Sequence, residues 1–243
     1  MALLEIQKLT KRFGGLVANR EISMQIDEGE IVGLIGPNGA GKSTFFAMVA
    51  GFYQPDGGRI FFNGEDITGR SPEYICRKGI TRTFQIVKPF EDMTVLENVM
   101  VGAFLRTASP TRARKEAEEV LEFTGLANKL DWEAKGLTIA DKKRLELARA
   151  LATKPKLLLL DEVMAGLTPT ETLEAVELIR QIHKRGIALF IVEHVMEVVM
   201  PISHRVVVLD GGEKIAEGTP EEVAKDPRVI KSYLGEMDHV ASG

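Results

Sequence analysis

Cysteine and long apolar runs are almost absent from this sequence. The single cysteine, Cys76, excludes an internal disulfide and a zinc site made of cysteines. Unbroken apolar runs such as Leu157 to Leu160 and Ile187 to Val192 are short. Because a membrane-spanning helix needs about 20 apolar residues, we predict that the chain does not span a bilayer. Any role at a membrane would then come through a partner.

A strong excess of charge of either sign is also missing. The formal net charge is −4, which gives no general attraction to nucleic acid or anionic lipid. Basic clusters at Arg112 to Lys115 and Lys142 to Arg144 lie in helix-like stretches rich in acids, so we interpret them as solvated helix faces. No charged-then-apolar leader opens the sequence, and Met1 to Glu5 resembles the start of a strand, so secretion is not expected.

What the sequence does have is the composition of a globular protein. It contains 243 residues, of which 44% are hydrophobic and 27% are charged. A chain of this length can bury one substantial core, or one core with a smaller subdomain. Internal repeats and low-complexity segments are absent from the sequence.

The most specific feature is a glycine-rich loop that directly follows the apolar run Ile31 to Ile35. The loop consists of Gly36, Pro37, Asn38, Gly39, Ala40, Gly41, Lys42, Ser43 and Thr44. It matches G-x-x-x-x-G-K-[ST] between a predicted strand and a predicted helix, which is the context of a phosphate-binding loop. In such a loop backbone N–H groups converge on the phosphates, and glycines permit the tight turn and close approach. The alternative is a glycine-rich turn without a ligand, which the preceding strand disfavours.

Side chains at the end of this loop suit nucleotide phosphates and Mg²⁺. We predict that Lys42 reaches the β- and γ-phosphates as a point charge. The hydroxyl of Ser43 is predicted to ligate Mg²⁺, while the helix after it presents its positive end to the phosphates. Thr44 belongs to the loop at the start of that helix, with no ligand role of its own. The loop leaves open which nucleotide binds.

Strands and helices alternate along most of the chain. Leu4 to Leu9 and Ile22 to Ile26 alternate with a period of two, which predicts two half-buried antiparallel strands before the loop. After it we predict a turn, a strand and another turn within 57–64, strands at 80–84, 156–161, 187–192, 205–209 and 213–217, and helices at 71–79, 138–151 and 169–184. From Thr94 to about Gly125 the pattern is helical without a strand signal. This order predicts an α/β fold with a mostly parallel core sheet and a helical insert.

A carboxylate pair ends the predicted strand of four leucines, Leu157 to Leu160. Asp161 is placed to hold Mg²⁺ through water, and Glu162 is our candidate for the group that polarises the attacking water. Because ligands bind at the carboxyl ends of strands in open α/β sheets, the pair should lie near the phosphate loop. A solvated acid pair at a strand end is the alternative.

Three more side chains are candidates for the same site. Gln85 and His194 follow predicted strands, as Asp161 does; each alone is as well explained as a satisfied polar residue. Phe13 lies beside two glycines upstream of the loop, where it would either stack on a nucleotide base or anchor a turn.

Together these motifs resemble the nucleotide-binding subunit of an ABC transporter, nearly from end to end. The resemblance implies that Gly36 to Thr44 is the Walker A loop, Asp161 the Walker B aspartate, Glu162 the catalytic base and Phe13 the base-stacking aromatic. It implies ATP and Mg²⁺ as cofactors. The fold implied is the P-loop ABC ATPase fold, in which the parallel core is joined by an antiparallel N-terminal β subdomain and an inserted helical subdomain.

The resemblance also implies roles for Gln85 and His194. Gln85 corresponds to the glutamine that senses Mg²⁺, as a ligand, together with the membrane partner, and His194 to the histidine at the γ-phosphate. The whole chain, 1–243, would form one ABC ATPase domain. Residues 1–85 and 156–243 would form a RecA-like core with the antiparallel β subdomain, and about 86–155 the helical signature subdomain.

Within the family, the ATPases of branched-chain amino acid importers are most similar. The resemblance rests on Arg82 to Gln85, Met93 to Val99, Ala165 to Glu171 and the tail from Glu217 to Glu236. It implies integral-membrane permease subunits, a second ATP-binding subunit or a second copy, and a substrate-binding protein reached through the permease. The chain would lie at the cytoplasmic face of the inner membrane. Lipopolysaccharide-export ATPases share the Tyr233 to Glu236 ending and are an alternative.

The sequence departs from the family at the signature motif. Where the family has L-S-G-G-Q, this chain has Leu137 to Asp141, in which Thr138 keeps the nucleotide-facing hydroxyl. We expect Thr138 and Asp141 to form a capping-box-like pair that commits this hydroxyl to its own helix. Asp141 would then place a carboxylate where phosphate must approach, and Ile139 would add bulk.

Two rival functions are weaker. Asp66 to Gly69 and Asn128 to Asp131 match the D-x-x-G and N-K-x-D motifs of GTPases, but an amphipathic helix at 115–124, not a buried strand, precedes the second motif. An ABC ATPase that acts on nucleic acid or ribosomes would usually have two cassettes or a long coiled-coil insertion. This chain has neither, nor a basic face, so nucleic acid is not expected as a partner.

Overall fold

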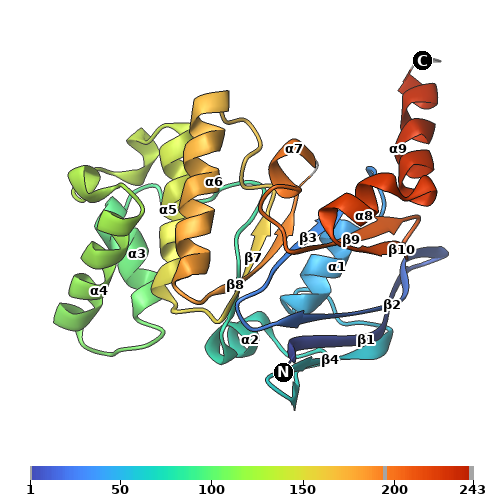
Figure 1. The fold of residues 1–243 in the computed structure, drawn as a ribbon. Coiled ribbons are helices and arrows are strands. Elements are labelled where there is room, and N and C mark those ends of the chain that lie inside the picture. Colours follow the sequence, from blue (N-terminus) through green and yellow to red (C-terminus); the bar gives the residue numbers. More distant parts are fainter. Residues whose placement is uncertain (1, 194–195, 241–243) are drawn as a thin grey trace.

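The computed structural model describes residues 2–193 and 196–240, with side chains up to residue 233. Two sheets and their helices build the fold (Figure 1). The first sheet is antiparallel, has the strand order β2-β1-β4-β5 and lies in the N-terminal part of the chain. Its strands are β1 (Ala2–Phe13), β2 (Leu16–Asp27), β4 (Gly57–Phe62) and β5 (Glu65–Asp66). β1 and β2 form a hairpin that extends beyond the two predicted strands at both ends.

The second sheet has the order β10-β9-β3-β8-β7-β6. Its strands are β3 (Ile31–Ile35), β6 (Ile80–Arg82), β7 (Leu157–Asp161), β8 (Ala188–Val192), β9 (Arg205–Asp210) and β10 (Glu213–Gly218). All are parallel except β10, which pairs antiparallel with β9 at one edge. Every residue of β3, β7 and β8 is buried, as expected for central parallel strands. The α/β fold class with a mostly parallel core sheet is confirmed.

Helix α1 (Lys42–Val49) lies between the two sheets. One hydrophobic core joins its Phe45 and Phe46 to the antiparallel sheet on one side and to Phe190 of β8 on the other. On the opposite face of the parallel sheet, a second core joins β7 and β8 to α5 (Ile139–Ala152) and α6 (Pro169–Lys184). The sheet is therefore covered on both faces. Because β3, β7 and β8 are parallel, their carboxyl ends lie at the same edge of the sheet.

The helical part consists of α3 (Val95–Ala103), α4 (Pro110–Phe123) and one face of α5, with two short 3₁₀ turns (Ala127–Lys129 and Ala134–Gly136). These helices have a core of their own, separate from the sheet cores. Local signals explain where the helices begin. Thr94 forms a capping box with Glu97, and the hydroxyls of Ser109 and Thr138 cap α4 and α5.

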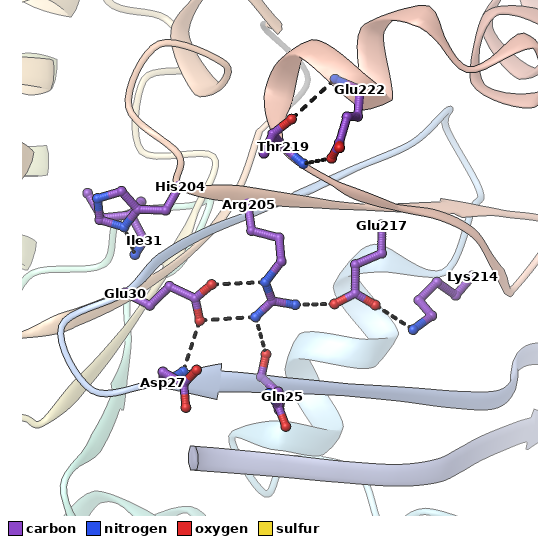
Figure 2. A network of polar contacts seen from close by, with 10 residues as sticks. All are labelled: Gln25, Asp27, Glu30, Ile31, His204, Arg205, Lys214, Glu217, Thr219 and Glu222. Carbon is purple, nitrogen blue, oxygen red and sulfur yellow. Dashed lines mark hydrogen bonds and ion pairs between the residues drawn. The ribbon is translucent and has the colours of Figure 1, made fainter. Parts of the chain in front are cut away.

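The C-terminal part begins with α7 (Met196–Val199), and β9 and β10 then lead to α8 (Pro220–Lys225) and α9 (Pro227–Val240). Arg205 of β9 ties this part to the rest (Figure 2). Its guanidinium donates to both carboxylate oxygens of Glu30, at 2.9 and 3.0 Å, to the Gln25 carbonyl at 2.6 Å and to Glu217. The network joins β9 to the end of β2, to the loop before β3 and to β10.

Most predicted elements are confirmed. The differences are at element ends and in β5, α7, α8 and α9, which the sequence did not predict. Helix α2 (Pro72–Lys78) is capped by Ser71 and ends at Gly79, as the sequence indicates. The strand expected at 80–84 stops at Arg82, because the chain then leaves the sheet edge toward Gln85.

Candidate functional site

The glycine-rich loop connects β3 to α1 and is packed on one side only. A Cβ on Gly36 would lie 2.1 Å from the Leu209 carbonyl oxygen, and one on Gly41 would lie 2.3 Å from the Ala18 carbonyl oxygen. Gly39, with φ of +77°, faces open space, because an added Cβ would meet no described atom within 4 Å. Glycines therefore let the loop pack on β9 and β2 while its other side stays accessible.

The groups that face this accessible side suit an anion. Lys42 is 8% exposed, and its ammonium donates to the carbonyls of Gly36 (2.6 Å) and Pro37 (2.9 Å), so it lies across the start of the loop. Among the described residues no side chain caps the N-terminus of α1, and its first turn contains no acid. A phosphate at this end of α1 would meet no capping side chain or acid, and the helix dipole favours an anion there.

The two carboxylates after the leucines of β7 have different environments. Asp161 is 3% exposed at the end of the strand. Glu162 has a φ of +49°, a left-handed conformation that is costly for a residue with a side chain. Its backbone is held there by two hydrogen bonds, from its N–H to the Val192 carbonyl (2.9 Å) and from the Lys143 ammonium to its own carbonyl (3.1 Å). Burial lowers the pKa of Lys143.

Gln85 meets Glu162 directly. Its amide nitrogen donates to the Glu162 carboxylate at 2.5 Å, although the two residues are far apart in sequence. This contact brings the end of the β6 segment over the end of β7, as the parallel order of the two strands predicts. One cavity of about 750 Å³ is lined by Ser43, Gln85 and Asp161 together.

A residue that the sequence analysis did not identify lies in this cavity. Arg82, the last residue of β6, donates to the Asp161 carboxylate at 2.6 Å. Its position at the end of the strand adjacent to β7 was a usable signal, because parallel neighbouring strands end at the same sheet edge.

Helix α5 holds the segment that follows Arg82. The Glu146 carboxylate accepts the Phe84 N–H at 2.8 Å, and burial raises the pKa of Glu146 to about 7. The Arg149 guanidinium donates to the Lys88 carbonyl at 3.0 Å and lies over the Phe90 ring, 4.6 Å from its centroid. Sequence reasoning missed Glu146 and Arg149 because both lie inside an ordinary helical pattern.

Phe13 lies at the end of β1 and outside the cavity lining. Its ring is 43% exposed, contacts Tyr53 edge-on at 5.4 Å and has the Lys11 ammonium 5.4 Å from its centroid. An exposed aromatic face of this kind is suitable for stacking on a base. His194 lies outside the described residues.

The signature region shows one expected contact and one difference. Thr138 caps α5 by accepting the Asp141 N–H at 3.2 Å, so its hydroxyl is committed as predicted. However, the Asp141 carboxylate turns inward to Lys129 (2.5 Å) and to the Thr138 hydroxyl (2.9 Å). Burial alone would raise the pKa of Asp141, but these two hydrogen bonds outweigh burial and lower it. Asp141 is 9% exposed and its carboxylate is bound within its own subunit, whereas Ile139 is 65% exposed at the start of the helix.

The contact between Lys129 and Asp141 also argues against a GTPase. Lys129 belongs to a 3₁₀ turn after α4, not to a loop after a buried strand, and its ammonium is bound to Asp141. Asp66 lies in the antiparallel sheet.

The site's chemistry fits Mg²⁺ and a nucleoside triphosphate. Within the described ranges no group of three His, Cys, Asp or Glu side chains gathers as an all-protein metal site. Mg²⁺ in phosphate-binding sites needs no such group, because it keeps waters and takes one or two protein oxygens plus phosphate oxygens. Ser43 and Asp161 supply such oxygens beside the open side of the loop.

The fold and this site define the class of protein: a P-loop ATPase of the ABC type. Residues 19–165 match the family model described as ABC transporter, and residues 213–239 match the model described as branched-chain amino acid ATP-binding cassette transporter. The chain belongs to the ABC transporter family and is an ATP-binding subunit that acts as an ATPase.

Relatives with branched-chain amino acid transport names match almost end to end. The protein LivG from Escherichia coli K12, a high-affinity branched-chain amino acid transport ATP-binding protein, is 42% identical, over 96% of this chain and 98% of its own length. BraF from Pseudomonas aeruginosa, which has the same description, is 40% identical over the same shares. The solved ADP conformation of MJ1267, an ATP-binding cassette of an ABC transporter, superposes with a TM-score of 0.88 at 32% identity, covering 97% of this chain and 99% of the other.

These comparisons confirm the predicted family, the ATPase activity and the fold. In the described part of the chain, none of the helices is long and apolar enough to cross a membrane.

Proposed function

We propose that this chain hydrolyses Mg²⁺·ATP to power import of branched-chain or similar hydrophobic amino acids. It acts with permease subunits, a second ATP-binding subunit and a substrate-binding protein that docks on the permease, and lies at the cytoplasmic face of the membrane. The observation that carries the ATPase part is the meeting of Ser43, Gln85 and Asp161 in one cavity beside the loop. The match of residues 213–239 supports the amino-acid substrate.

In the proposed site the loop from Gly36 to Thr44 binds the triphosphate. Lys42 leaves the loop carbonyls and reaches the β- and γ-phosphates, whose charge replaces its two neutral acceptors. Ser43 holds Mg²⁺ directly and Asp161 holds it through water, with Gln85 as a further oxygen ligand. Mg²⁺ when bound neutralises charge that develops on the phosphates.

Glu162 orients the attacking water in this proposal. Its strained backbone points the carboxylate away from the line of β7, and Gln85 covers that carboxylate in the structure. Gln85 must therefore move from Glu162 toward the metal before Glu162 can accept a proton from water. Phe13 stacks on the adenine, and His194 contacts the γ-phosphate.

We also propose that the permease docks on the helical part, at about 86–155, while 1–85 and 156–243 form the RecA-like core with its antiparallel sheet. The separate core of the helices supports this division. Exposed apolar side chains include Phe84, Ile86 and Val101, which line the cavity, and Phe90 and Phe104 of the same part of the chain. The buried Asn98 side chain accepts a hydrogen bond from the Phe90 N–H at 2.9 Å and donates one to the Phe90 carbonyl at 3.0 Å. These two bonds fix the loop that carries the exposed Phe90 side chain.

The proposed function is tested by transport with matched variants. The chain, its permease, its second ATP-binding subunit and its binding protein are reconstituted in proteoliposomes, and uptake of labelled leucine is measured with internal ATP. The unaltered chain should support uptake, and Lys42→Ala should abolish it and ATP hydrolysis, because the phosphates lose the only cation of the loop.

Glu162→Gln separates binding from hydrolysis. This variant should bind ATP but hydrolyse it at least 100-fold more slowly. Leucine uptake at parent level by Lys42→Ala would contradict the ATPase role. Uptake of no hydrophobic amino acid by an active ATPase would contradict the substrate class and favour the lipopolysaccharide-export type. Purification with nucleic acid or ribosomes instead of a permease would contradict transport.

A further inference from the structure

An ion pair occupies the metal side of the site. The Arg82 guanidinium donates to the Asp161 carboxylate at 2.6 Å, and the two side chains are only 12% and 5% exposed. The pair joins the ends of β6 and β7. The proposed roles of the phosphate loop and of Glu162 do not require an arginine at this position. The ion pair must therefore have another role.

The guanidinium is held by little else. It lies near two aromatic rings, 5.8 Å from the Phe52 centroid and 5.3 Å from the Phe84 centroid, and these rings contact each other edge-on. Its Nε atom is buried and has no hydrogen-bond partner among the described residues. Both rings are partly exposed, so the guanidinium can make a cation–π contact with them if it leaves Asp161.

The backbone on either side does not depend on the ion pair. The Thr83 N–H donates to the Leu159 carbonyl at 2.9 Å, and the Asp161 N–H donates to the Thr83 hydroxyl at 3.2 Å. These bonds keep β6 and β7 together, so the Arg82 side chain can move while the two strand ends stay in place.

Arg82 and the expected metal ligands line the same cavity. A metal ion held by Ser43 and Asp161 would therefore lie close to the guanidinium. Two cations in a largely buried site repel strongly, since screening by water is weak there. The Asp161 carboxylate also cannot fully compensate the positive charges of the guanidinium and of the metal ion at the same time.

We propose that Arg82 is the internal counter-ion of Asp161 and competes with Mg²⁺ for it. The pair keeps the buried carboxylate compensated in the nucleotide-free chain, and the guanidinium moves from Asp161 toward the Phe52 and Phe84 rings when Mg²⁺·nucleotide binds. Arg82 thus raises the Mg²⁺ concentration that tight nucleotide binding requires. This inference rests on the proposed Mg²⁺·ATP site.

The test measures binding, not hydrolysis. A fluorescent, non-hydrolysable ATP analogue is titrated into the full chain at a series of Mg²⁺ concentrations. Arg82→Gln should lower the Mg²⁺ concentration for half-maximal tightening of nucleotide binding about tenfold, as expected for loss of one nearby positive charge. Arg82→Lys, which keeps the charge, should retain the parent value. Arg59→Gln removes an exposed arginine whose partner Asp66 is 3.9 Å away, and should also retain it.

Thermal unfolding supplies a second measurement. Without metal, Arg82→Gln should melt below the parent, because Asp161 stays buried without its cation. With Mg²⁺ and the analogue this gap should shrink. If Arg82→Gln does not fold, Arg82→Met, whose apolar side chain suits the two rings, replaces it in both measurements.

Two results would overturn the competition. Arg82→Gln could leave the Mg²⁺ requirement unchanged and lower the melting temperature equally with and without Mg²⁺ and the analogue. That result would mean that Arg82 only stabilises the fold. A higher Mg²⁺ requirement would mean that Arg82 orients Asp161 toward the metal. Failure of the unaltered chain to bind the analogue at any Mg²⁺ concentration would instead contradict the proposed function on which the inference rests.

Discussion

Asp141 and Lys129 show how a single contact changes the role assigned to a residue from its sequence. In the sequence Asp141 is an acid at the position of a neutral amide in the family signature, and Lys129 belongs to a motif that resembles a guanine-binding one. In the structure they are bound to each other at 2.5 Å, and this contact argues against the guanine-binding interpretation of Lys129. Asp141 instead stabilises the start of α5.

Lys129→Met should therefore destabilise the chain. Removal of the ammonium leaves the Asp141 carboxylate, in a residue 9% exposed, with the Thr138 hydroxyl as its remaining hydrogen-bond partner among the described residues. We expect a loss of about 1–2 kcal/mol in the free energy of unfolding near pH 7, measured by urea denaturation. Lys135→Met is the matched control, because the Lys135 and Glu133 side chains are more than half exposed.

The loss should depend on pH in a defined direction. The folded-state pKa of Asp141 is lowered, so its contribution to stability is present above the ordinary pKa of an aspartate, about 3.9, and is lost as the pH falls through the folded value. The difference between parent and Lys129→Met should thus be full at neutral pH and shrink below about pH 4. A difference that stays constant down to pH 3 would refute the ion pair as its source.

At the scale of elements, α5 connects the signature region to the segment after Gln85. Thr138 begins the helix, Lys143 reaches the backbone of Glu162, and Arg149 holds Lys88 and Phe90. A small shift of this helix would therefore move both Glu162, the proposed catalytic base, and the proposed permease surface. This geometry suits coupling between ATP hydrolysis and a membrane partner.

Phe90→Asp tests that surface. Phe90 is 44% exposed, and an aspartate there would still meet the Arg149 guanidinium, so the segment should keep its place. We expect transport by the assembled system to fall at least tenfold while the isolated subunit keeps its ATPase rate, because an apolar contact with the permease is lost.

Ile230→Asp on α9 is the control for this substitution, since Ile230 is 46% exposed. It should leave transport unchanged. Loss of both ATPase and transport in Phe90→Asp would show that the segment is part of the folding core instead.

At the scale of the whole molecule, the signature predicts an unequal pair of ATP sites. In ABC dimers each ATP lies between one subunit's phosphate loop and the other subunit's signature. Here Thr138 is committed to its own helix, and Ile139 is 65% exposed where the family has glycine. The site that this signature completes should be the slower one, and a heterodimer would carry the defect only once.

Glu162→Gln in this chain should therefore stop leucine transport, because it removes the proposed catalytic base of the faster site. The corresponding glutamate substitution in the second ATP-binding subunit should be tolerated better. Both are measured in the same reconstituted transporter. Equal loss from the two changes, or full-rate ATPase from this chain as a homodimer, would rule out the asymmetry.

The sequence by itself determined the elements whose causes are local. The loop from Gly36 to Thr44 needs only neighbouring residues to be recognised, since its glycines, Lys42 and flanking strand and helix are consecutive. Leu157 to Leu160 predicted a buried strand because a short, continuous apolar run that ends in a carboxylate pair suits a central strand buried on both faces. Helix starts at Ser71 and Thr138 also followed from side chains that bond their own backbone.

Only the tertiary structure decided which distant side chains meet. Arg82 on Asp161, Gln85 on Glu162, and Lys129 on Asp141 join residues that are up to 79 positions apart. Each pair depends on side-chain direction and on the adjacency of β6 with β7 or of the 3₁₀ turn with α5, which no local pattern contains. Charge and hydrogen bonding act over a few ångströms in space, so the partners of a buried carboxylate are set by packing and not by distance along the chain.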